Sequence, residues 1–307
     1  MTDLASLKAA DLPLVRTRMV GEVRMHALEA GLQRLDGGAM FGVVPKPLWE
    51  RRIPADARNR IPLALRCFLL EMPDALVLVE TGLGNKESEK FTDIYGVENA
   101  AEDPAHPDRL HDALAEAGFS AADVDIVVNT HLHFDHAGGN TYRDANGEVK
   151  LSFPEARYLV QRGEWEYAHD TNERTSASYL PYNYDPVERA GRLELLEGDG
   201  EIVPGLSVFG TPGHCPHHQS VLVRSGGQAA CILADVLPTM AHLPLPWIMG
   251  YDVEPLRTLE SKRALLDRAV RESWLLCSVH DPLTAWGSAV MGARGVELGG
   301  DEDGGRR

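Results

Sequence analysis

Short apolar runs bounded by turn residues recur along the chain and predict β-strands. Two of them, residues 65–70 and 75–79, flank the turn Met72-Pro73-Asp74 and predict a pair of neighbouring strands. Similar runs lie at residues 126–128, 206–209, 220–223, 229–233 and 275–279. Apolar runs of this length between turn residues are typical of strands buried in a sheet.

Apolar residues spaced three or four positions apart predict helices between these strands. The segment from Asp108 to Ala117 places Leu110 and Leu114 on one face and is followed by Gly118, a common helix stop. A second helix is expected at residues 162–169. A third is expected at residues 255–270, where the apolar stripe consists of Leu256, Leu259, Leu266 and Ala269.

The alternation of strands and helices favours an α/β sandwich. No linker or short-period repeat divides the chain, so residues 1–307 are expected to form a single domain. Residues 1–20 are expected to be an N-terminal extension. Residues 292–307 contain six glycines and mixed charges, and we expect this tail not to pack.

Composition and charge narrow the classes of partner. The chain has 307 residues, of which 44% are hydrophobic and 25% charged, as in globular proteins. No apolar run approaches the roughly 18 residues of a membrane span, and no signal peptide is recognisable, so we expect a cytoplasmic protein without a membrane partner. The net charge of −16 disfavours nucleic acid and favours a neutral or weakly charged small molecule. A homodimer is one oligomeric state that the sequence permits.

The four cysteines are widely spaced, and no two form a Cys-x-x-Cys pair. Reduced thiols are therefore expected for Cys67, Cys215, Cys231 and Cys277. Cys215 follows a candidate metal ligand, His214, but neighbouring side chains on an extended segment point apart. We expect all four to be structural.

Four potential metal ligands follow the apolar run at residues 126–128. They are His131, His133, Asp135 and His136, within the sequence Thr-His-Leu-His-Phe-Asp-His. The period of two in a strand would direct the first three to one side, whereas His136 needs a turn to reach the same place. Imidazoles and carboxylates in this arrangement are good ligands for a divalent first-row metal.

Three further polar residues each follow a predicted strand. They are His214 in the turn Thr-Pro-Gly-His, Asp235 after an apolar run, and His280 after the last strand. Strand ends on a shared sheet edge are common places for sites. Five histidines and two aspartates satisfy two metal ions if one aspartate bridges them. Spacing alone does not divide the ligands between the ions.

The order of these motifs resembles that of the metallo-β-lactamase-fold hydrolases. The likeness runs from about residue 35 to residue 285. It implies a four-layered αβ/βα sandwich with the metals on one edge between two similar halves. It also implies one ion on His131, His133 and His214, the other on Asp135, His136 and His280, and Asp235 between them. Glu80 stands where the family usually has an aspartate that orients a ligand from behind, and we expect it to do the same.

Within that family, the segments 131–140 and 211–220 are similar to those of N-acyl-homoserine lactone lactonases, the quorum-quenching enzymes. Residues 235–252 resemble a branch that contains lactonases and methyl parathion hydrolase-like enzymes. Many lactonases carry a tyrosine three residues after the bridging aspartate to bind the lactone carbonyl. Here Pro238 occupies that position.

The resemblance implies that a metal-bridging hydroxide opens the ester of a lactone, most simply an N-acyl-homoserine lactone. Asp235 would bridge the ions and Asp135 would shuttle the proton. Phosphotriester hydrolysis and glyoxalase-like thioester hydrolysis are the alternatives. Two divalent ions are expected, zinc first, with manganese, iron or cobalt left open.

A substrate pocket is expected near the ligands. Its candidate wall residues are Phe41, Trp49, His242, Trp247, Met249 and Tyr251. His217 and His218 exceed the donors needed and are expected to act behind the ligands or structurally. The remaining histidines, His26, His106, His111 and His169, are expected at the surface.

Overall fold

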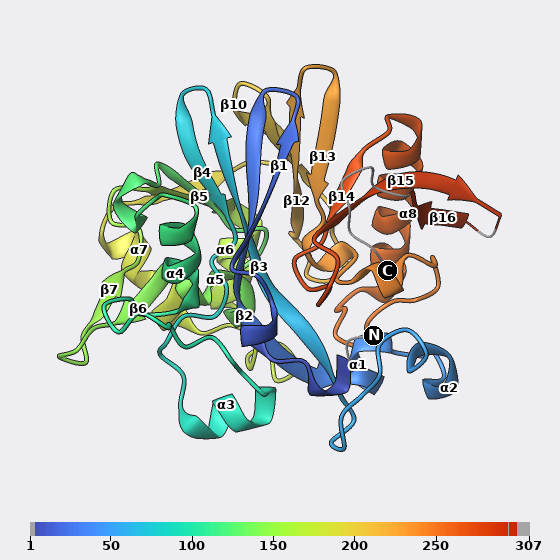
Figure 1. Cartoon of the computed structure of the whole chain (residues 1–307), viewed down its shortest axis with the longest axis horizontal. Helices are drawn as coiled ribbons and strands as arrows, with labels where there is room; N and C mark the ends of the chain where they lie inside the picture. The colour runs from blue at the N-terminus through green and yellow to red at the C-terminus, as the bar shows by residue number, and fades with distance from the viewer. Residues whose placement is uncertain (1–3, 294, 300–307) are drawn as a thin grey trace.

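Two seven-stranded β-sheets form the middle of the molecule (Figure 1) in the computed structural model, which describes residues 4–293 and 295–299. The strands of the first sheet, in spatial order, are β1 (Val15–Val20), β2 (Val23–Asp36), β3 (Arg60–Met72), β4 (Ala75–Val79), β5 (Ile126–Val128), β8 (Arg157–Gln161) and β9 (Leu193–Leu196). Those of the second are β10 (Gly200–Val203), β11 (Leu206–Gly210), β12 (Gln219–Ser225), β13 (Gln228–Ile232), β14 (Leu275–Cys277), β15 (Trp286–Gly292) and β16 (Gly295–Leu298). Two short strands, β6 (Thr141–Arg143) and β7 (Val149–Leu151), pair separately.

Strand direction places several carboxyl ends at one edge. In the first sheet, β4 and β5 run parallel, as do β5 and β8. In the second, β11 and β13 each pair antiparallel with β12 and so share a direction, and β13 is parallel to β14. The segments that leave β4, β5, β11, β13 and β14 carry the polar residues singled out above.

Apolar side chains fill the space between the two sheets and behind each of them. The central cluster joins residues of both, such as Val77 and Val128 with Val221 and Ile232. A second cluster packs the helix α4 (Arg109–Glu116) on the outer face of the first sheet, and a third packs α8 (Pro255–Arg271) on the second. The layers are therefore helix, sheet, sheet and helix (Figure 1), which confirms the expected four-layered sandwich.

The predicted helices form with nearly the expected bounds. Asp108 caps α4 by accepting a hydrogen bond from the backbone N–H of His111, and α6 spans Arg162–His169. The stripe predicted for α8 is shifted, because Leu256 is 77% exposed and the buried residues begin at Thr258. The other helices are α1 (Gly37–Phe41), α2 (Lys46–Trp49), α3 (Glu89–Tyr95), α5 (Phe134–Ala137) and α7 (Asp185–Arg189).

Both chain ends take more part in the fold than expected. Residues 15–20 are strand β1, paired with β2 in register from Val15 to Val20. The prediction that residues 292–307 do not pack is wrong for β16, which pairs with β15 and brings Val296 and Leu298 against the cluster under α8. The rest of that tail, from residue 300, lies outside the described residues.

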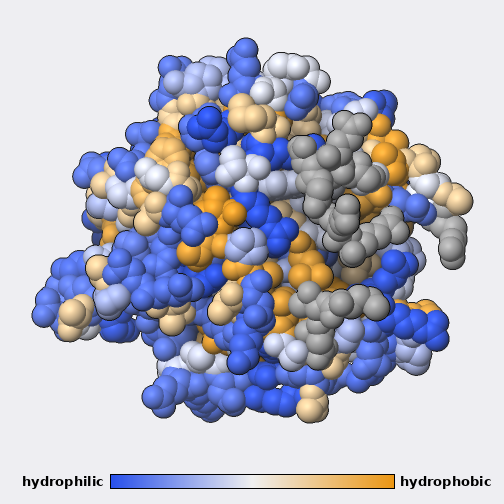
Figure 2. All heavy atoms as spheres, in the orientation of Figure 1, coloured by the Kyte–Doolittle hydropathy of each residue, from blue (hydrophilic) through white to orange (hydrophobic). Residues whose placement is uncertain are grey.

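Hydrophilic residues dominate the face shown in the space-filling view, and hydrophobic ones show mainly in its middle (Figure 2). Within residues 4–293 and 295–299, no helix combines the length and apolar character needed to cross a membrane.

Candidate metal centre

The ligand-rich motif leaves β5 and turns at once into a short helix. The strand ends at Val128, and α5 begins at Phe134, so Asp135 and His136 both project from its first turns. The rings of His131 and His136 lie 4.0 Å apart between centroids, and those of His131 and His133 lie 4.5 Å apart. The motif therefore gathers its imidazoles by a strand-to-helix turn, rather than by strand alternation alone.

The three other candidates arrive from the second sheet. His214 follows Gly213, whose φ of +137° suits glycine, and a Cβ there would meet the backbone nitrogen of Thr258 at 2.2 Å. Asp235 lies in a single 3-10 turn at Ala234–Val236. His280 follows β14, and its Nδ1–H donates to the carbonyl of Ala64 at 2.8 Å.

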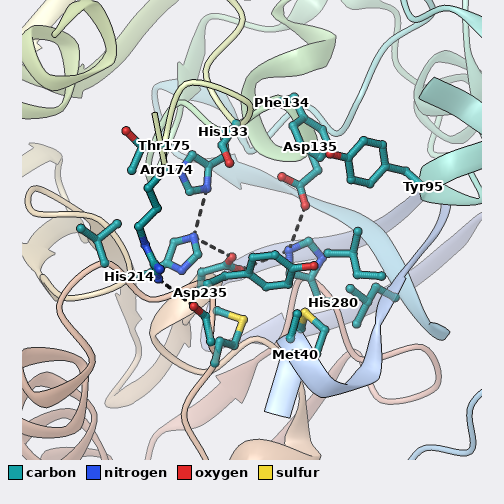
Figure 3. Close-up of a pocket in the computed structure, with 18 residues that line it drawn as sticks. Met40, Tyr95, His133, Phe134, Asp135, Arg174, Thr175, His214, Asp235 and His280 are labelled. Atoms are coloured by element: carbon teal, nitrogen blue, oxygen red, sulfur yellow. Dashed lines mark hydrogen bonds and ion pairs between the residues drawn. The ribbon is translucent and has the colours of Figure 1, made fainter. Parts of the chain in front are cut away.

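Asp235 lies between the two groups of histidines. Its Oδ2 is 3.1 Å from His214 Nε2, while its Oδ1 is 3.2 Å from His280 Nε2 and 3.5 Å from His136 Nε2. Burial alone would raise the pKa of this carboxyl, but His136, His280 and His214 hold it well below its usual range. The carboxylate therefore faces both halves of the ligand set with a different oxygen (Figure 3).

The hydrogen bonds of the imidazoles leave lone pairs directed at a common centre. Nδ1–H of His280 is given to a carbonyl, and Nδ1 of His136 lies 3.3 Å from Glu80 Oε1, yet the two Nε2 atoms are only 3.0 Å apart. His131 Nε2 and Asp235 Oδ1 are buried without a hydrogen-bond partner. Lone pairs that converge, together with buried nitrogen and oxygen atoms that lack a hydrogen-bond partner, are suited to bind a cation between them.

The charge balance of the cluster points the same way. Burial lowers the pKa of His131 and His133 well below the usual value, and the neighbouring imidazoles lower it further, so both rings are neutral and could act as metal ligands. Burial would also lower the pKa of His136, but Asp235, Asp135 and Glu80 raise it well above its usual value. The field that attracts a proton to His136 also attracts a metal ion.

Ligand atoms of two sets lie within 4.8 Å of one another and could each hold an ion: His131, His133 and His214, and Asp135, His136 and His280. A third group of the same kind consists of Glu80, His131 and His136. Glu80 has a φ of 66° and accepts a hydrogen bond from the Thr130 hydroxyl, which turns its Oε1 towards His136 Nδ1. This placement supports the expectation that Glu80 orients a ligand.

Sequence reasoning missed the residues that hold the ligands from behind. The Gln33 side-chain amide, on β2, donates to Asp135 Oδ2, and Asp252 Oδ1 accepts from His214 Nδ1–H at 3.0 Å. His218 Nε2 accepts the backbone N–H of Asp235 at 3.1 Å, and burial lowers its pKa to about 3, so its ring is neutral. Gln33 is a fully buried amide on β2, and because that strand was not predicted, nothing in the sequence pattern indicated its burial.

A cavity of about 500 Å³ opens beside these ligands. Asp135, His133, His214, Asp235 and His280 all reach it (Figure 3). The rest of its wall has three parts. The apolar part is made by Leu35, Ala39, Met40, Leu63, Phe134, Met249 and Val253; the phenols are Tyr95 and Tyr251; the polar part is Arg174, Thr175 and Ser178.

Two of the predicted wall residues, Met249 and Tyr251, line this cavity, but the other four do not. Phe41 is fully buried and stacks on His242 at 4.5 Å and on Trp49 at 5.2 Å between ring centroids, and Trp247 packs on its edge. His242 Nε2–H donates to the Met40 carbonyl, and burial lowers the pKa of the ring to about 3. This corrects the expectation for Phe41, Trp49, His242 and Trp247, which support the wall from behind.

The expectations for the other histidines and the thiols are partly corrected. His169 is exposed and His106 half-buried, but His26 and His111 are buried against Glu71 and Asp108, because each carboxylate partner compensates burial. His217 is exposed. All four cysteines are buried, and none forms a disulfide within the described part of the chain. Burial and the Glu164 carboxylate raise the pKa of Cys215 well above its usual value, so this thiol is not a reactive thiolate.

Comparison with known proteins assigns the chain to a family. The model of the Metallo-beta-lactamase superfamily matches residues 61–278. An N-acyl homoserine lactonase from Bacillus cereus is 31% identical over 230 residues, which cover 73% of this chain and 83% of the relative. A probable metal-dependent hydrolase from Staphylococcus aureus superposes with a TM-score of 0.83 and 30% identity, covering 92% of this chain and 97% of that one.

A further solved structure is an N-acyl homoserine lactone hydrolase with its product, N-hexanoyl-L-homoserine, bound at the catalytic metal centre. It is 25% identical, with a TM-score of 0.64, and the match covers 88% of this chain and 95% of that one. The family match extends over most of the described chain and includes every residue of the ligand cluster except His280, which lies two residues beyond it. The chain therefore belongs to the metallo-beta-lactamase superfamily and is a metal-dependent hydrolase.

Proposed function

We propose that this protein holds two divalent metal ions and opens the ester ring of lactones, N-acyl-homoserine lactones first among them. The observation that carries the proposal is the double-faced contact of Asp235, whose two oxygens address His214 on one side and His136 and His280 on the other. The lactonase relative from Bacillus cereus supports the choice of ester.

One ion would be held by His131, His133 and His214, the other by Asp135, His136 and His280, and Asp235 would touch both. Ions bound there would lower the pKa of a bound water to about 7 and polarise the ester carbonyl. Zinc suits imidazole and carboxylate ligands of this kind.

The chain supplies the remaining functions. Asp135 reaches the cavity from α5 with one oxygen held by the Gln33 amide, so its carboxylate is positioned to carry a proton to the departing alkoxide. The apolar wall around Met40, Leu63 and Met249 matches an acyl chain. A cavity of about 500 Å³ has the size of a small amphipathic ligand.

Pro238 stands where many lactonases carry a tyrosine, so that position has no hydroxyl to donate a hydrogen bond. Pro238 is buried, and its carbonyl accepts a hydrogen bond from the Ser278 hydroxyl at 2.8 Å. Tyr95 from α3 and Tyr251 from the loop before α8 line the cavity instead. Their hydroxyls are the phenolic donors that this cavity offers to a lactone carbonyl.

The proposal is tested with a panel of substrates on zinc-replete protein. The panel contains N-acyl-homoserine lactones, simple γ-lactones, phosphotriesters and glutathione thioesters. We expect the lactones to have the highest kcat/KM and bound zinc to approach two equivalents. If only phosphotriesters or only thioesters were hydrolysed, the lactonase assignment would be wrong and one of those activities would replace it.

Replacement of the shared carboxylate tests the pairing of the ions. Asp235→Asn keeps the shape but removes the charge that faces both histidine groups, so we expect loss of about one equivalent of metal and a fall in kcat of at least about a hundredfold. Metal analysis and lactone turnover measure the two effects. A variant with near-normal turnover and one ion would contradict a shared role for Asp235.

A further inference from the structure

One wall of the active-site cavity carries a cation that the proposed reaction does not use. Among the described residues lining the cavity, Arg174 is the sole lysine or arginine. It lies on the side of His133 and His214, next to Thr175, and Tyr95 lies across the cavity near Asp135 (Figure 3).

The guanidinium is fixed but not saturated. Its Nη2 donates to the backbone carbonyls of Gly250 at 2.8 Å and Asp252 at 3.1 Å. A guanidinium has five N–H donors, and within residues 4–293 and 295–299 no partner is found for Nη1 or Nε of Arg174. The clamp therefore orients the group and leaves donors for a ligand.

Several other arginines of this acidic chain pair with carboxylates. Arg34 contacts Glu98 at 2.7 Å, and Arg224 contacts Glu272 at 2.6 Å. The described residues contain no such partner for Arg174, although acidic residues outnumber basic ones by 46 to 30. An arginine that lines a cavity and makes no ion pair of its own is suited to bind a carboxylate of a ligand.

We propose that Arg174 forms a subsite for a carboxylate that the substrate carries away from its scissile ester. The substrate class is then a lactone with an anionic substituent, such as an acyl chain that ends in a carboxylate. Ser178 and Thr175 provide neighbouring hydroxyls, and the apolar wall takes the methylene groups between the ring and the anion. The inference rests on the proposed lactone-opening function of the same cavity.

Binding of two isosteric, hydrolytically inert ligands tests this subsite without turnover. The ligands are γ-lactam analogues of homoserine lactone, one with an N-glutaryl chain and one with an N-(5-methylhexanoyl) chain, which differ only in a carboxylate in place of an isopropyl group. Calorimetry on the zinc-replete protein should show the glutaryl ligand binding roughly tenfold to a hundredfold more tightly, as expected for a charge-assisted pair.

Variants separate recognition from the structural clamp. Arg174→Met should abolish the preference for the glutaryl ligand and leave the affinity for the neutral ligand within about twofold. Arg174→Lys should retain part of the preference, because it keeps the charge. Arg257→Met is the matched control, since Arg257 is exposed and paired with Glu254, and it should keep the full preference.

Two results would overturn the subsite: equal or weaker binding of the glutaryl ligand by the wild type, or equal loss of both ligands in Arg174→Met at unchanged metal content. Turnover of the two corresponding lactones separates this inference from the proposed function. Preferential binding of the glutaryl lactam with no hydrolysis of either lactone would refute the proposed lactonase function but not the subsite. Hydrolysis of the lactones with equal affinity for the two lactams would refute the subsite but not the lactonase function.

Discussion

Three of the candidate metal ligands are oriented by contacts on their far side. His214 gives its Nδ1–H to Asp252, His280 gives its own to the Ala64 carbonyl, and Asp135 receives the Gln33 amide. Such contacts fix which ring nitrogen keeps its lone pair and turn that lone pair towards the ion. The chemistry of the site is therefore decided as much by these partners as by the ligands.

At this scale, the Tyr95 hydroxyl is expected to be a substrate contact. Burial raises the pKa of Tyr95, and Asp135 and Glu87 raise it further, so the phenol stays protonated at neutral pH and can donate. Tyr95→Phe should lower lactone kcat/KM by roughly tenfold with unchanged metal content.

The matched control is Tyr182→Phe, because Tyr182 donates its hydroxyl to Glu87 and does not line the cavity. It should leave kcat/KM unaltered. Equal kinetics of the wild type and Tyr95→Phe would transfer the donor role to Tyr251.

The elements around the site are held at close backbone contacts. The turn after α5 passes so near the end of β4 that a Cβ on Gly139 would lie 2.0 Å from the Thr81 carbonyl oxygen. On the other side, the Lys262 ammonium of α8 donates to the carbonyls of Pro244 and Trp247, each at 2.9 Å. These two contacts determine where α5 and the loop bearing Met249 and Tyr251 can lie.

The close contact at Gly139 predicts that a single methyl group disturbs the centre. Gly139→Ala should lower the free energy of unfolding by about 1–3 kcal/mol and reduce bound metal, because α5 must move with His136. Gly200→Ala, where a Cβ meets nothing within 4 Å, is the control. Urea denaturation and metal analysis give the comparison, and normal metal content in Gly139→Ala would speak against the contact.

The buried Lys262 predicts a pH-dependent contribution to stability. Burial lowers its pKa from 10.5 to about 7, so between pH 7 and 10.5 the unfolded chain holds a proton that the folded chain has lost. Stability from this group therefore rises with pH across that window and is constant below it.

The comparison is between wild type and Lys262→Met, unfolded with urea at pH 7, 8.5 and 10. The free energy of unfolding of the wild type minus that of Lys262→Met should increase with pH. The same difference for the exposed Lys90→Met control should stay constant. A difference for Lys262→Met that stayed constant over this range would refute the lowered pKa.

Across the whole molecule, a buried ion pair links the two halves. Arg66 on β3 contacts Glu29 on β2 at 2.6 Å, and both side chains are fully buried. The same guanidinium donates through Nη1 to the Ser278 carbonyl at 2.8 Å, in the segment that carries His280. A residue of the first sheet thereby contacts the segment of the second sheet that carries His280.

Removal of this pair should therefore affect both stability and metal binding. Arg66→Met leaves Glu29 buried without its partner, and we expect a loss of about 3–5 kcal/mol in the free energy of unfolding, with weaker metal binding through His280. The exposed ion pair between Arg24 and Glu71 offers a control. Its removal in Arg24→Met should lower the free energy of unfolding by less than about 1 kcal/mol.

The double variant Glu29→Gln/Arg66→Met should recover part of the stability, because no unpaired charge remains. Chemical denaturation of the three proteins measures the effects. A loss in Arg66→Met no larger than in Arg24→Met would show that the pair does not join the halves.

Local patterns in the sequence were enough to predict the candidate ligands and their places at strand ends, because apolar runs, turns and a strand-to-helix motif depend on neighbours in the chain. Strands β4, β5 and β11 to β14 and helices α4, α6 and α8 followed from the same local patterns. The 14-residue β2 did not, since its apolar and charged residues alternate irregularly and only pairing with β3 buries them.

Contacts between residues far apart in the sequence could be seen only in the tertiary structure. Gln33 reaches Asp135 from 102 positions away, and Arg66 reaches Ser278 from 212 positions away. The cavity wall was decided in the same way, with Arg174 and Tyr95 inside it and Phe41 and Trp49 behind it. Which side chain faces a cavity depends on how the layers pack, and no local pattern encodes that arrangement.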